Sequence, residues 1–259
     1  MNMIIRDFYD GLKLFYVWRV LAWTDILQRY KRTIIGPFWG VITTTILLLF
    51  IGPVYSKLFG QNLTEYFPYV AVSYVIWNFF STLVAEGANS LIISTDYIKH
   101  MAWPFSVYFY RCVMRNIFVL IHNFIVLIPL LFYFNLISLH GILLFIVGLG
   151  LICILGFAIT IVLGILSLRY RDIPQLVTNL LNMLFFLTPV LWFENMLGAS
   201  RWIVQLNPFF HVLEVLRRPL LGGVPEIISY YIILISIFVF LFLGFYFFNK
   251  TKKELAFWA

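Results

Sequence analysis

The chain has 259 residues, of which 63% are hydrophobic and 11% are charged, and its formal net charge is +7. Soluble domains carry about 25% charged residues, so a soluble fold of this length could not bury so much apolar surface. The composition therefore predicts an integral membrane protein and excludes an ordinary soluble domain. The cations gather at the ends of apolar runs and not on one basic face, which argues against nucleic-acid binding and is typical of topology signals.

Residues 7–32 predict an amphipathic helix that lies in the membrane interface, because polar and apolar side chains separate onto two faces at helical spacing. Arg19 lies within the apolar face, where it either extends its charge to the interface or meets an anionic headgroup. The apolar face holds Phe8, Leu12, Phe15, Ala22, Ile26 and Tyr30, and the polar face holds Arg6, Asp10, Lys13, Thr24, Gln28 and Lys31.

A basic stretch and a Gly-Pro pair follow this helix and precede the first long apolar run. Because Gly-Pro interrupts a helix, we expect the chain to turn there from the membrane surface into the bilayer. Anchoring on the cytoplasmic side explains the sign of the charges, and the alternative is that the cations also guide the anionic headgroup of a substrate. The residues concerned are Arg29, Lys31, Arg32, Gly36, Pro37 and Trp39.

Six apolar runs predict six transmembrane helices, because about 20 residues at 1.5 Å each match a hydrocarbon layer of about 30 Å. Both chain ends then share one side with most of the Lys and Arg residues, and the positive-inside rule places that side in the cytoplasm. We thus expect an all-α integral membrane protein, with an N-terminal interfacial segment (1–35) and a six-span domain (36–259). The spans are 37–58, 68–85, 105–134, 142–168, 173–193 and 226–248.

Two polar segments separate apolar runs. Residues 86–104 predict a short amphipathic helix on the cytoplasmic side. Residues 194–225, on the opposite side, predict two short helices that are broken at Asn207-Pro208. These helices either dip into the outer leaflet or cap a pore, and the alternative is a folded outer loop without a gating role.

We recognise no motif for catalysis, cofactor binding or metal binding in the sequence. It contains no G-x-x-x-x-G-K-[ST] pattern, and the four histidines are scattered along the chain. Gly148, Gly150 and Gly156 lie within an apolar run, which favours close helix packing over a nucleotide-binding loop.

Polar side chains within the predicted spans are few. His122 and Asn123 lie near the middle of the third span, and we interpret them as interhelical hydrogen-bonding groups, since a proton relay would need more ionisable groups at that depth. Glu86, Arg111 and Arg115 lie within a turn or two of the cytoplasmic boundary, where interfacial anchoring and a functional role are both open.

Four motifs in chain order resemble those of the permease subunits of bacterial ATP-binding-cassette polysaccharide exporters, which export O-antigen, capsule or teichoic acid. The resemblance covers essentially the whole chain, although Trp103-Pro104 stands where relatives usually have Phe-Pro. The motifs are Arg29-Tyr30-Lys31-Arg32 with Gly36-Pro37-Phe38-Trp39, Arg169-Tyr170-Arg171-Asp172-Ile173, Thr188-Pro189-Val190, and Asn207-Pro208 with Arg217 to Gly222.

This resemblance implies a homodimer in the bacterial cytoplasmic membrane that binds two copies of a separate ATP-binding subunit. The pore would form between the protomers, chiefly from the first and fifth spans, and residues 194–225 would gate it. Residues 90–103 would form the coupling helix that contacts the ATP-binding subunit. The residues expected to couple are Asp96, Tyr97, Lys99 and His100, and those of a cytoplasmic turn are Arg169, Tyr170, Arg171 and Asp172.

The implied cargo is a lipid-linked polysaccharide, whose sugar rings would stack on exposed aromatic side chains. Ordinary placement in an aromatic belt is the alternative explanation for these side chains. The residues expected at the outer gate or along the glycan path are Tyr108, Tyr110, Trp192, Phe193, Trp202, Asn207 and Pro208, and Trp39 is a further aromatic expected to be exposed.

Three other functions compete with this one. An ATP-binding-cassette exporter of a small drug or lipid would usually carry a large outer domain. An ion-coupled secondary carrier would need charged residues at the membrane midplane. An integral-membrane transferase would need a cluster of His, Asp or Glu residues, which the sequence does not indicate.

Overall fold

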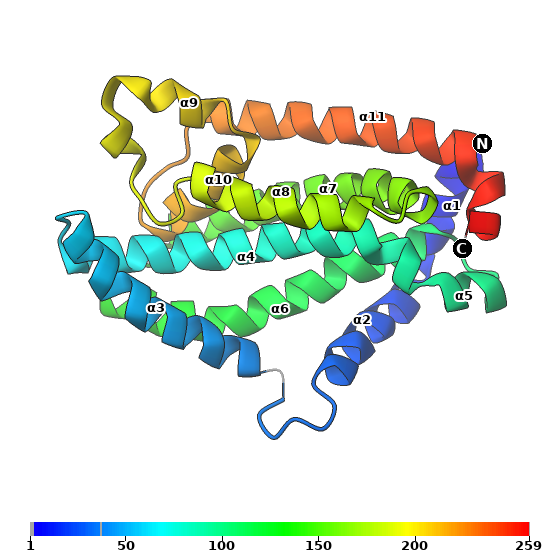
Figure 1. The fold of residues 1–259 in the computed structure, drawn as a ribbon, viewed down its shortest axis with the longest axis horizontal. Coiled ribbons are helices and arrows are strands. Elements are labelled where there is room, and N and C mark those ends of the chain that lie inside the picture. The colour runs from blue at the N-terminus through cyan, green and yellow to red at the C-terminus, as the bar shows by residue number, and fades with distance from the viewer. Residues whose placement is uncertain (1–2, 37, 259) are drawn as a thin grey trace.

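A computed structural model describes residues 3–36 and 38–258, and every regular element in that part of the chain is a helix (Figure 1). Five of these helices are long and apolar enough to cross a membrane, which confirms the predicted all-helical membrane class. They are α3 (Phe38–Leu58), α4 (Leu63–Ile93), α6 (Ser106–Tyr133), α7 (Leu139–Arg169) and α11 (Ile227–Trp258). The others are α1 (Met3–Lys13), α2 (Phe15–Arg29), α5 (Thr95–His100), α8 (Ile173–Leu187), η1 (Glu194–Arg201), α9 (Trp202–Gln205) and α10 (Pro208–Leu220).

The helix in the predicted fifth span, α8, is shorter than expected. It has 15 residues, which reach about 22 Å and fall short of a hydrocarbon layer of about 30 Å. The helix ends because Pro189 disfavours helical angles at the residue before it, and Thr188 accordingly has extended angles of φ −99° and ψ 138°. The chain continues without a helix to Phe193.

The boundaries around 59–67 and 86–104 also differ from the prediction. α4 begins at Leu63 and continues to Ile93, so that only α5 remains as a separate helix within 86–104. Glu86 stays within α4 because an ion pair with Arg115 of α6, at 2.8 Å, compensates its charge. The predicted break at Asn207-Pro208 is confirmed, and the Asn207 side chain caps α10 by accepting the Phe209 N–H at 3.0 Å.

The predicted interfacial helix 7–32 is wrong as a single element, because the chain forms α1 and α2 with a break at Leu14. The break lets α1 contact both α6 and α11, while α2 packs chiefly along α6. In α1, Asp7 accepts the Ser106 backbone N–H at 3.1 Å. Leu12 and Phe15, expected on the apolar face, are 52% and 48% exposed.

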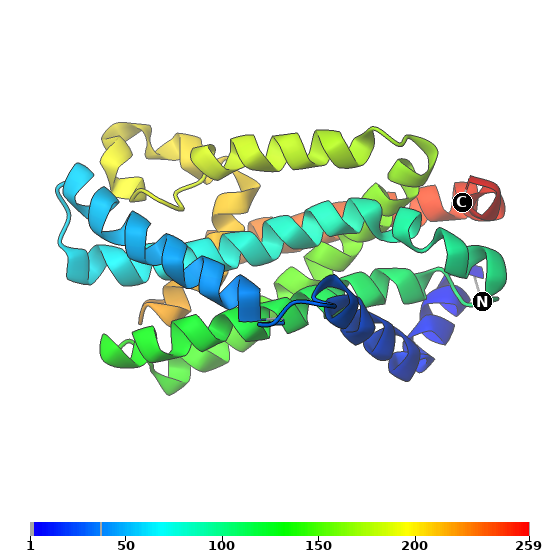
Figure 2. The same ribbon diagram turned by 60° about the horizontal axis from the view of Figure 1, so that its bottom comes forward.

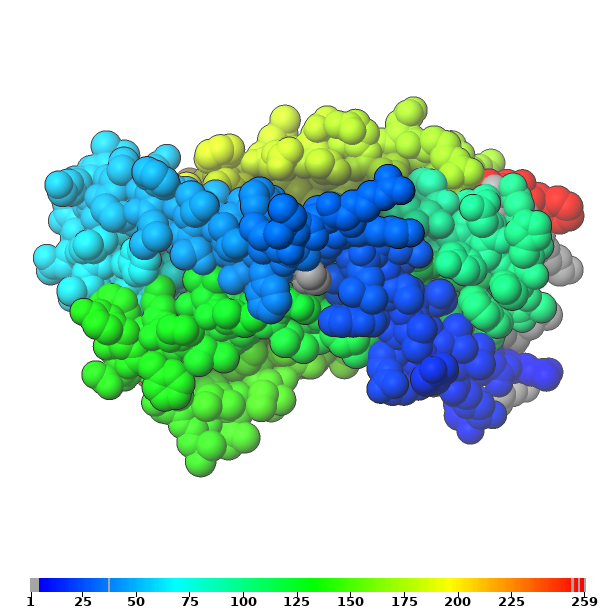
Figure 3. Space-filling view, turned by 90° about the horizontal axis from the view of Figure 1, so that it is seen from below, coloured from blue at the N-terminus to red at the C-terminus, as the bar shows by residue number. Residues whose placement is uncertain are grey.

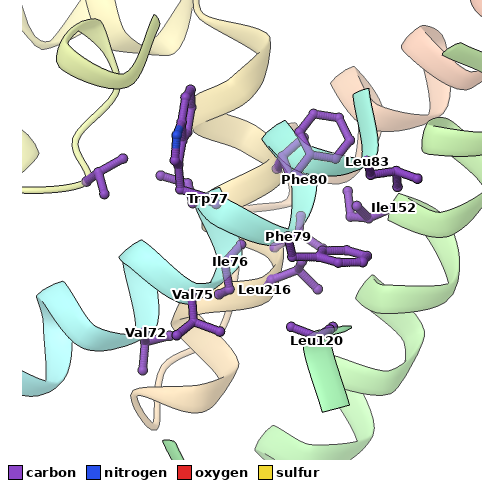
Figure 4. Packing of buried hydrophobic residues seen from close by; sticks show 14 of the residues in the cluster. Val72, Val75, Ile76, Trp77, Phe79, Phe80, Leu83, Leu120, Ile152 and Leu216 are labelled. Carbon is purple, nitrogen blue, oxygen red and sulfur yellow. The ribbon is translucent and has the colours of Figure 1, made fainter. Parts of the chain in front are cut away.

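α4 forms the centre of the core, with α3, α6, α7 and α8 around it (Figures 1 and 2). Its buried side chains pack against those of α6, α7 and α10 (Figure 4). Gly156 of α7 lies against Leu83, and Gly148 lies against Val215 of α10, so close packing is confirmed at both glycines, whereas Gly150 faces open space. The labelled core residues are Val72, Val75, Ile76, Trp77, Phe79, Phe80, Leu83, Leu120, Ile152 and Leu216.

The two ends of the bundle differ in the elements they carry. α1, α5 and the last turns of α11 lie together at one end, which we call the α5 end, and η1 and α9 lie at the opposite end, the α9 end (Figure 1). Each end holds a cluster of charged side chains.

Candidate functional site

Five charged side chains from α2, α4 and α6 form a cluster near the α5 end, which we call the α2–α4–α6 cluster: Asp25, Arg29, Glu86, Arg111 and Arg115. The Asp25 carboxylate accepts two hydrogen bonds from Arg111, at 2.5 and 2.8 Å, and one from Arg115, at 3.2 Å. Glu86 accepts from Arg115 at 2.8 Å and from Arg29 at 2.5 Å. Three guanidinium groups against two carboxylates leave the cluster with one net positive charge.

Burial makes this cluster a structural link between three helices. The side chains of Asp25, Glu86 and Arg111 are 13%, 15% and 7% exposed. Charges removed from water are costly unless they are paired. Asp25 therefore holds α2 to α6, and the pair of Arg29 with Glu86 links α2 to α4. The sequence prediction named Glu86, Arg111 and Arg115 but not Asp25. The available signal was its position three residues after Ala22, on the buried face of α2.

The predicted coupling residues lie together on α5 and the turn that follows. Asp96, Lys99 and His100 are exposed, so this short helix presents polar side chains to its surroundings. Tyr97 is half-buried and stacks on Trp103, with 6.1 Å between ring centroids. The Arg111 guanidinium lies 5.1 Å from the Tyr97 ring centroid, so Tyr97 connects α5 with the α2–α4–α6 cluster.

The basic stretch after α2 is exposed, and only Arg29 of its cations joins the cluster (Figure 3). Lys31 and Arg32 are exposed, and Arg32 and Gly36 adopt left-handed angles with φ of 69° and 62°. Pro37 lies outside the described residues, and Trp39 is 56% exposed.

Arg19, expected on the apolar face of the N-terminal segment, lies beside aromatic side chains of α2. It is exposed. Its guanidinium lies over the rings of Phe15 and Tyr16, at 5.4 and 5.9 Å from their centroids. The buried face consists of Trp18, Ala22 and Ile26.

α8 carries polar side chains on its exposed face. Only Val177 and Leu181 of this helix are buried. Gln175 donates a hydrogen bond to Asn179 at 3.1 Å, and both side chains are exposed. Thr178 and Asn182 are exposed as well.

A second cluster of charges, the α10 cluster, lies toward the α9 end. Arg217 is buried and donates to the Tyr69 hydroxyl at 2.7 Å, the Ser73 hydroxyl at 3.2 Å and the Pro189 carbonyl at 2.8 Å. It thereby holds the non-helical stretch 188–193 against α4 and α10. The other members are Glu194, Arg201, Glu214, Arg218 and Glu226.

Opposing effects act on the Glu214 carboxyl within the α10 cluster. Burial raises its pKa, and the guanidinium groups of Arg217 and Arg218 oppose that shift. Arg218 also pairs with Glu226 at 3.2 Å, so the exposed rim of the cluster has more than one possible pairing.

The aromatic residues expected along a glycan path differ in exposure. Tyr108 was expected to be exposed but is buried at 1% exposure, because it lies in an apolar cluster with side chains of α4, α7 and α11. Tyr110, in the same turns, stacks on Phe157 with 4.7 Å between ring centroids. Trp192 and Phe193 are half-buried, and Trp202 is 59% exposed.

Asn207 and Pro208 lie where α9 and α10 meet. The Asn207 amide donates to the Thr188 hydroxyl at 2.9 Å, which joins this junction to the end of α8. Pro208 lines an apolar cavity of about 290 Å³ between α4, α7, α8, α10 and α11.

The predicted turn at 169–172 is exposed and contacts the last turn of α11. The Arg169 guanidinium lies 5.1 Å from the Trp258 ring centroid. Arg171 donates to the Trp258 carbonyl at 3.0 Å. The turn therefore connects the end of α7 with the end of α11.

Comparison with known proteins places this architecture in a family. Residues 16–221 match the ABC-2 type transporter family. The chain is 24% identical to the O-antigen export system permease protein RfbA of Klebsiella pneumoniae, over 98% of this chain and 99% of that protein. It is 26% identical to the protein of the same name from Myxococcus xanthus, over 82% of each chain. Since the family match runs from α2 to the end of α10 and includes several apolar helices, the chain is a multi-pass membrane protein of the ABC-2 type transporter family.

Proposed function

We propose that this chain is the permease subunit of an ATP-driven exporter that moves a lipid-linked polysaccharide across the bacterial cytoplasmic membrane. The observation that carries the proposal is the similarity to an O-antigen export permease along 98% of the chain. ATP hydrolysis would take place on a separate subunit, because the sequence contains no phosphate-binding loop of its own.

The α5 end faces the cytoplasm in this proposal, and the chain crosses the membrane six times. Elements from the two ends of the chain, α1 and the last turns of α11, lie at the same end of the bundle, which agrees with an even number of crossings (Figure 1). α8 and the stretch 188–193 together make the fifth crossing. α2 and the exposed Lys31 and Arg32 then lie at the cytoplasmic interface, as the positive-inside rule requires.

Two copies of the chain would enclose the pathway. Amide side chains are costly in contact with lipid, yet Gln175, Asn179 and Asn182 are exposed on α8. A second copy facing α8 across a hydrated pore would cover them and leave them free to bind sugar hydroxyls. α3 would complete the pore lining, and the segment 194–225 with the α10 cluster would gate its outer end.

Two ATP-binding subunits would act on α5. Its exposed Asp96, Lys99 and His100 suit a docking surface, and Tyr97 and Arg111 lead from it to Asp25 on α2. Movement of α5 would thus be passed to α2 and, through the stretch 30–36, to α3. Arg19, Lys31, Arg32 and Trp39 would lie where the anionic headgroup reaches the membrane surface.

Reconstitution tests this function directly. The chain and its ATP-binding subunit are placed in proteoliposomes with a fluorescent lipid-linked glycan, and glycan transfer across the bilayer is measured by protection from an added lectin. We expect transfer that needs ATP and stops with a hydrolysis-deficient partner. Transfer of a small amphipathic dye but not of the glycan would instead indicate a drug or lipid exporter. Transfer that survives without ATP and stops with a protonophore would indicate a secondary carrier.

Variants of α5 test the coupling assignment separately. Asp96→Ala combined with His100→Ala should abolish export, since both side chains are exposed at the proposed docking surface. Insertion and dimerisation should not change, because neither side chain contributes to the core. Unchanged export by this double variant would contradict the coupling role of α5.

A further inference from the structure

A polar pocket of about 170 Å³ lies between α2, α3, α4 and α6, next to the α2–α4–α6 cluster. At about 30 Å³ per water molecule, it has room for about five waters or for one small polar group. The polar side chains that line it are Arg29, Tyr30, Asn78, Thr82, His122 and Asn123. Of these, only Arg29 belongs to the charge cluster.

Asn123 presents an amide without a protein partner to the pocket. Its side chain is 4% exposed and lines the pocket. Its amide has no hydrogen-bond partner among residues 3–36 and 38–258. The amide borders the space of the pocket, so its hydrogen-bonding capacity is open to a group bound there. A bound group that supplies the missing hydrogen bonds accounts for an amide at this position.

The neighbouring His122 adds a ring nitrogen to the polar lining of the pocket. Its Nδ1 lies 2.7 Å from the Phe118 carbonyl oxygen. A carbonyl oxygen only accepts hydrogen bonds, so Nδ1 carries a proton and donates to it, and no hydrogen bond of Nε2 is recorded among the described residues. The ring stacks near Trp23 of α2, with 6.3 Å between ring centroids, which holds its orientation.

The polar lining contains both hydrogen-bond donors and acceptors. This favours sugar hydroxyls over a bare phosphate as the ligand of the pocket. A phosphate is best bound by donors and cations. The pocket instead combines two amides, two hydroxyls and an imidazole with one guanidinium, that of Arg29, which is paired with Glu86 at 2.5 Å. Such a set can both donate to and accept from hydroxyl groups.

The position of the pocket relates it to the cluster. Asn78, Thr82 and Glu86 follow one another at intervals of four residues on α4 and therefore share one face of the helix. Arg115 and His122, seven residues apart, do the same on α6. The polar side chains of the pocket thus continue those of the charge cluster along α4 and α6.

We propose that this pocket binds a neutral sugar of the lipid-linked cargo, the one next to the lipid phosphate, while Arg29 at its edge faces the phosphate. The assignment rests on the proposed export function and names the part of the substrate that the subunit recognises. Asn78 and Asn123, on opposite helices, bind the sugar hydroxyls.

Binding of two matched lipids to the complete transporter in nanodiscs tests this assignment. One probe is a short polyprenyl diphosphate that carries a single hexose, and the other is the same diphosphate without the sugar. Asn123→Leu should weaken binding of the hexose-bearing probe about tenfold or more, as expected for one or two lost hydrogen bonds. Binding of the sugar-free probe should not change. The thermal midpoint of unfolding should not fall, because the Asn123 amide has no hydrogen-bond partner within the described part of the chain.

Two further variants make the result specific. Asn78→Leu, on the opposite wall, should give the same selective loss. Asn89→Leu is the control, because its amide already donates to the Ala85 carbonyl of its own helix at 3.1 Å and does not line the pocket. It should leave binding of both probes unchanged.

An equal loss for both probes, or a lower thermal midpoint, would assign Asn123 a structural role and overturn the proposal. If phosphatidylglycerol displaces the hexose-bearing probe and binds with the same affinity, the pocket does not distinguish a sugar from a glycerol headgroup, and the choice of a sugar is overturned. If the wild-type transporter exports glycan, but Asn123→Leu still prefers the hexose-bearing probe over the sugar-free probe as strongly as wild type does, only the pocket assignment is overturned. Wild-type transporter that exports no glycan would overturn the proposed function.

Discussion

The two charge clusters are built differently, although both contain guanidinium groups and carboxylates. The α2–α4–α6 cluster joins residues far apart in the chain, with Asp25 and Arg111 separated by 86 positions. The α10 cluster mostly joins residues within 194–226, and only Arg217 reaches α4. Arg201 and Glu226 at its rim are 36% and 37% exposed, whereas Asp25 and Arg111 are 13% and 7% exposed.

This difference suggests different mechanical roles. Buried charges have no water to replace a lost partner, so the α2–α4–α6 cluster keeps three helices at fixed positions relative to one another. Partly exposed pairs are weak and can exchange partners with water, so the rim of the α10 cluster can rearrange at little cost. The first arrangement suits transmission of movement from α5, and the second suits a gate.

The largest effect is expected for Asp25→Ala. It leaves Arg111 and Arg115 buried without their shared carboxylate, and removal of one partner from a buried pair costs about 3–5 kcal/mol. The free energy of unfolding, measured by denaturant titration in detergent, should fall by that amount. ATP hydrolysis by the complex should also lose its coupling to export, because α2 is no longer held to α6.

Asp10→Ala is the matched control for this prediction. Asp10 pairs with Arg6 at 3.6 Å, but its side chain is 42% exposed. An exposed pair of this kind contributes less than about 1 kcal/mol. Equal losses of stability for the two variants would contradict the distinction between buried and exposed pairs.

An intermediate effect is expected for Arg217→Met. Met fills much of the same volume but removes the hydrogen bonds to Tyr69, Ser73 and Pro189. Tyr69 keeps a bond to the Pro189 carbonyl at 2.9 Å, so part of the network remains. We expect a loss of about 2–3 kcal/mol in the free energy of unfolding. Hydrogen exchange should rise first in 188–193, the stretch that Arg217 holds.

Arg201→Gln should change stability far less, since the rim of the α10 cluster offers other partners. If Arg217→Met left exchange in 188–193 unchanged while Arg201→Gln raised it, the division between a buried anchor and an exchangeable rim would be wrong.

Local sequence signals predicted the elements better than the contacts between them. Apolar runs identified the five long helices, and Asn207-Pro208 placed the junction of α9 and α10, because hydropathy and proline act within a few residues. Asp25 could not be paired with Arg111 in this way, since one sequence contains no information on which distant side chains meet. The burial of Tyr108 was missed for the same reason, because its neighbours come from other helices.

The smallest effect on stability, but a large one on export, is expected for Arg29→Gln. The Arg29 side chain is 48% exposed, and Glu86 retains Arg115 at 2.8 Å and Asn116 at 2.9 Å, so the loss should be below about 1 kcal/mol. Export should nevertheless fall, because Arg29 alone joins the charge cluster to the polar pocket. Arg6→Gln is the control, since the Arg6 side chain is 76% exposed and pairs with Asp10 of its own helix at 3.6 Å. A loss of stability as large as that of Asp25→Ala would mean that Arg29 is a structural member of the cluster, and unchanged export would remove it from the substrate path.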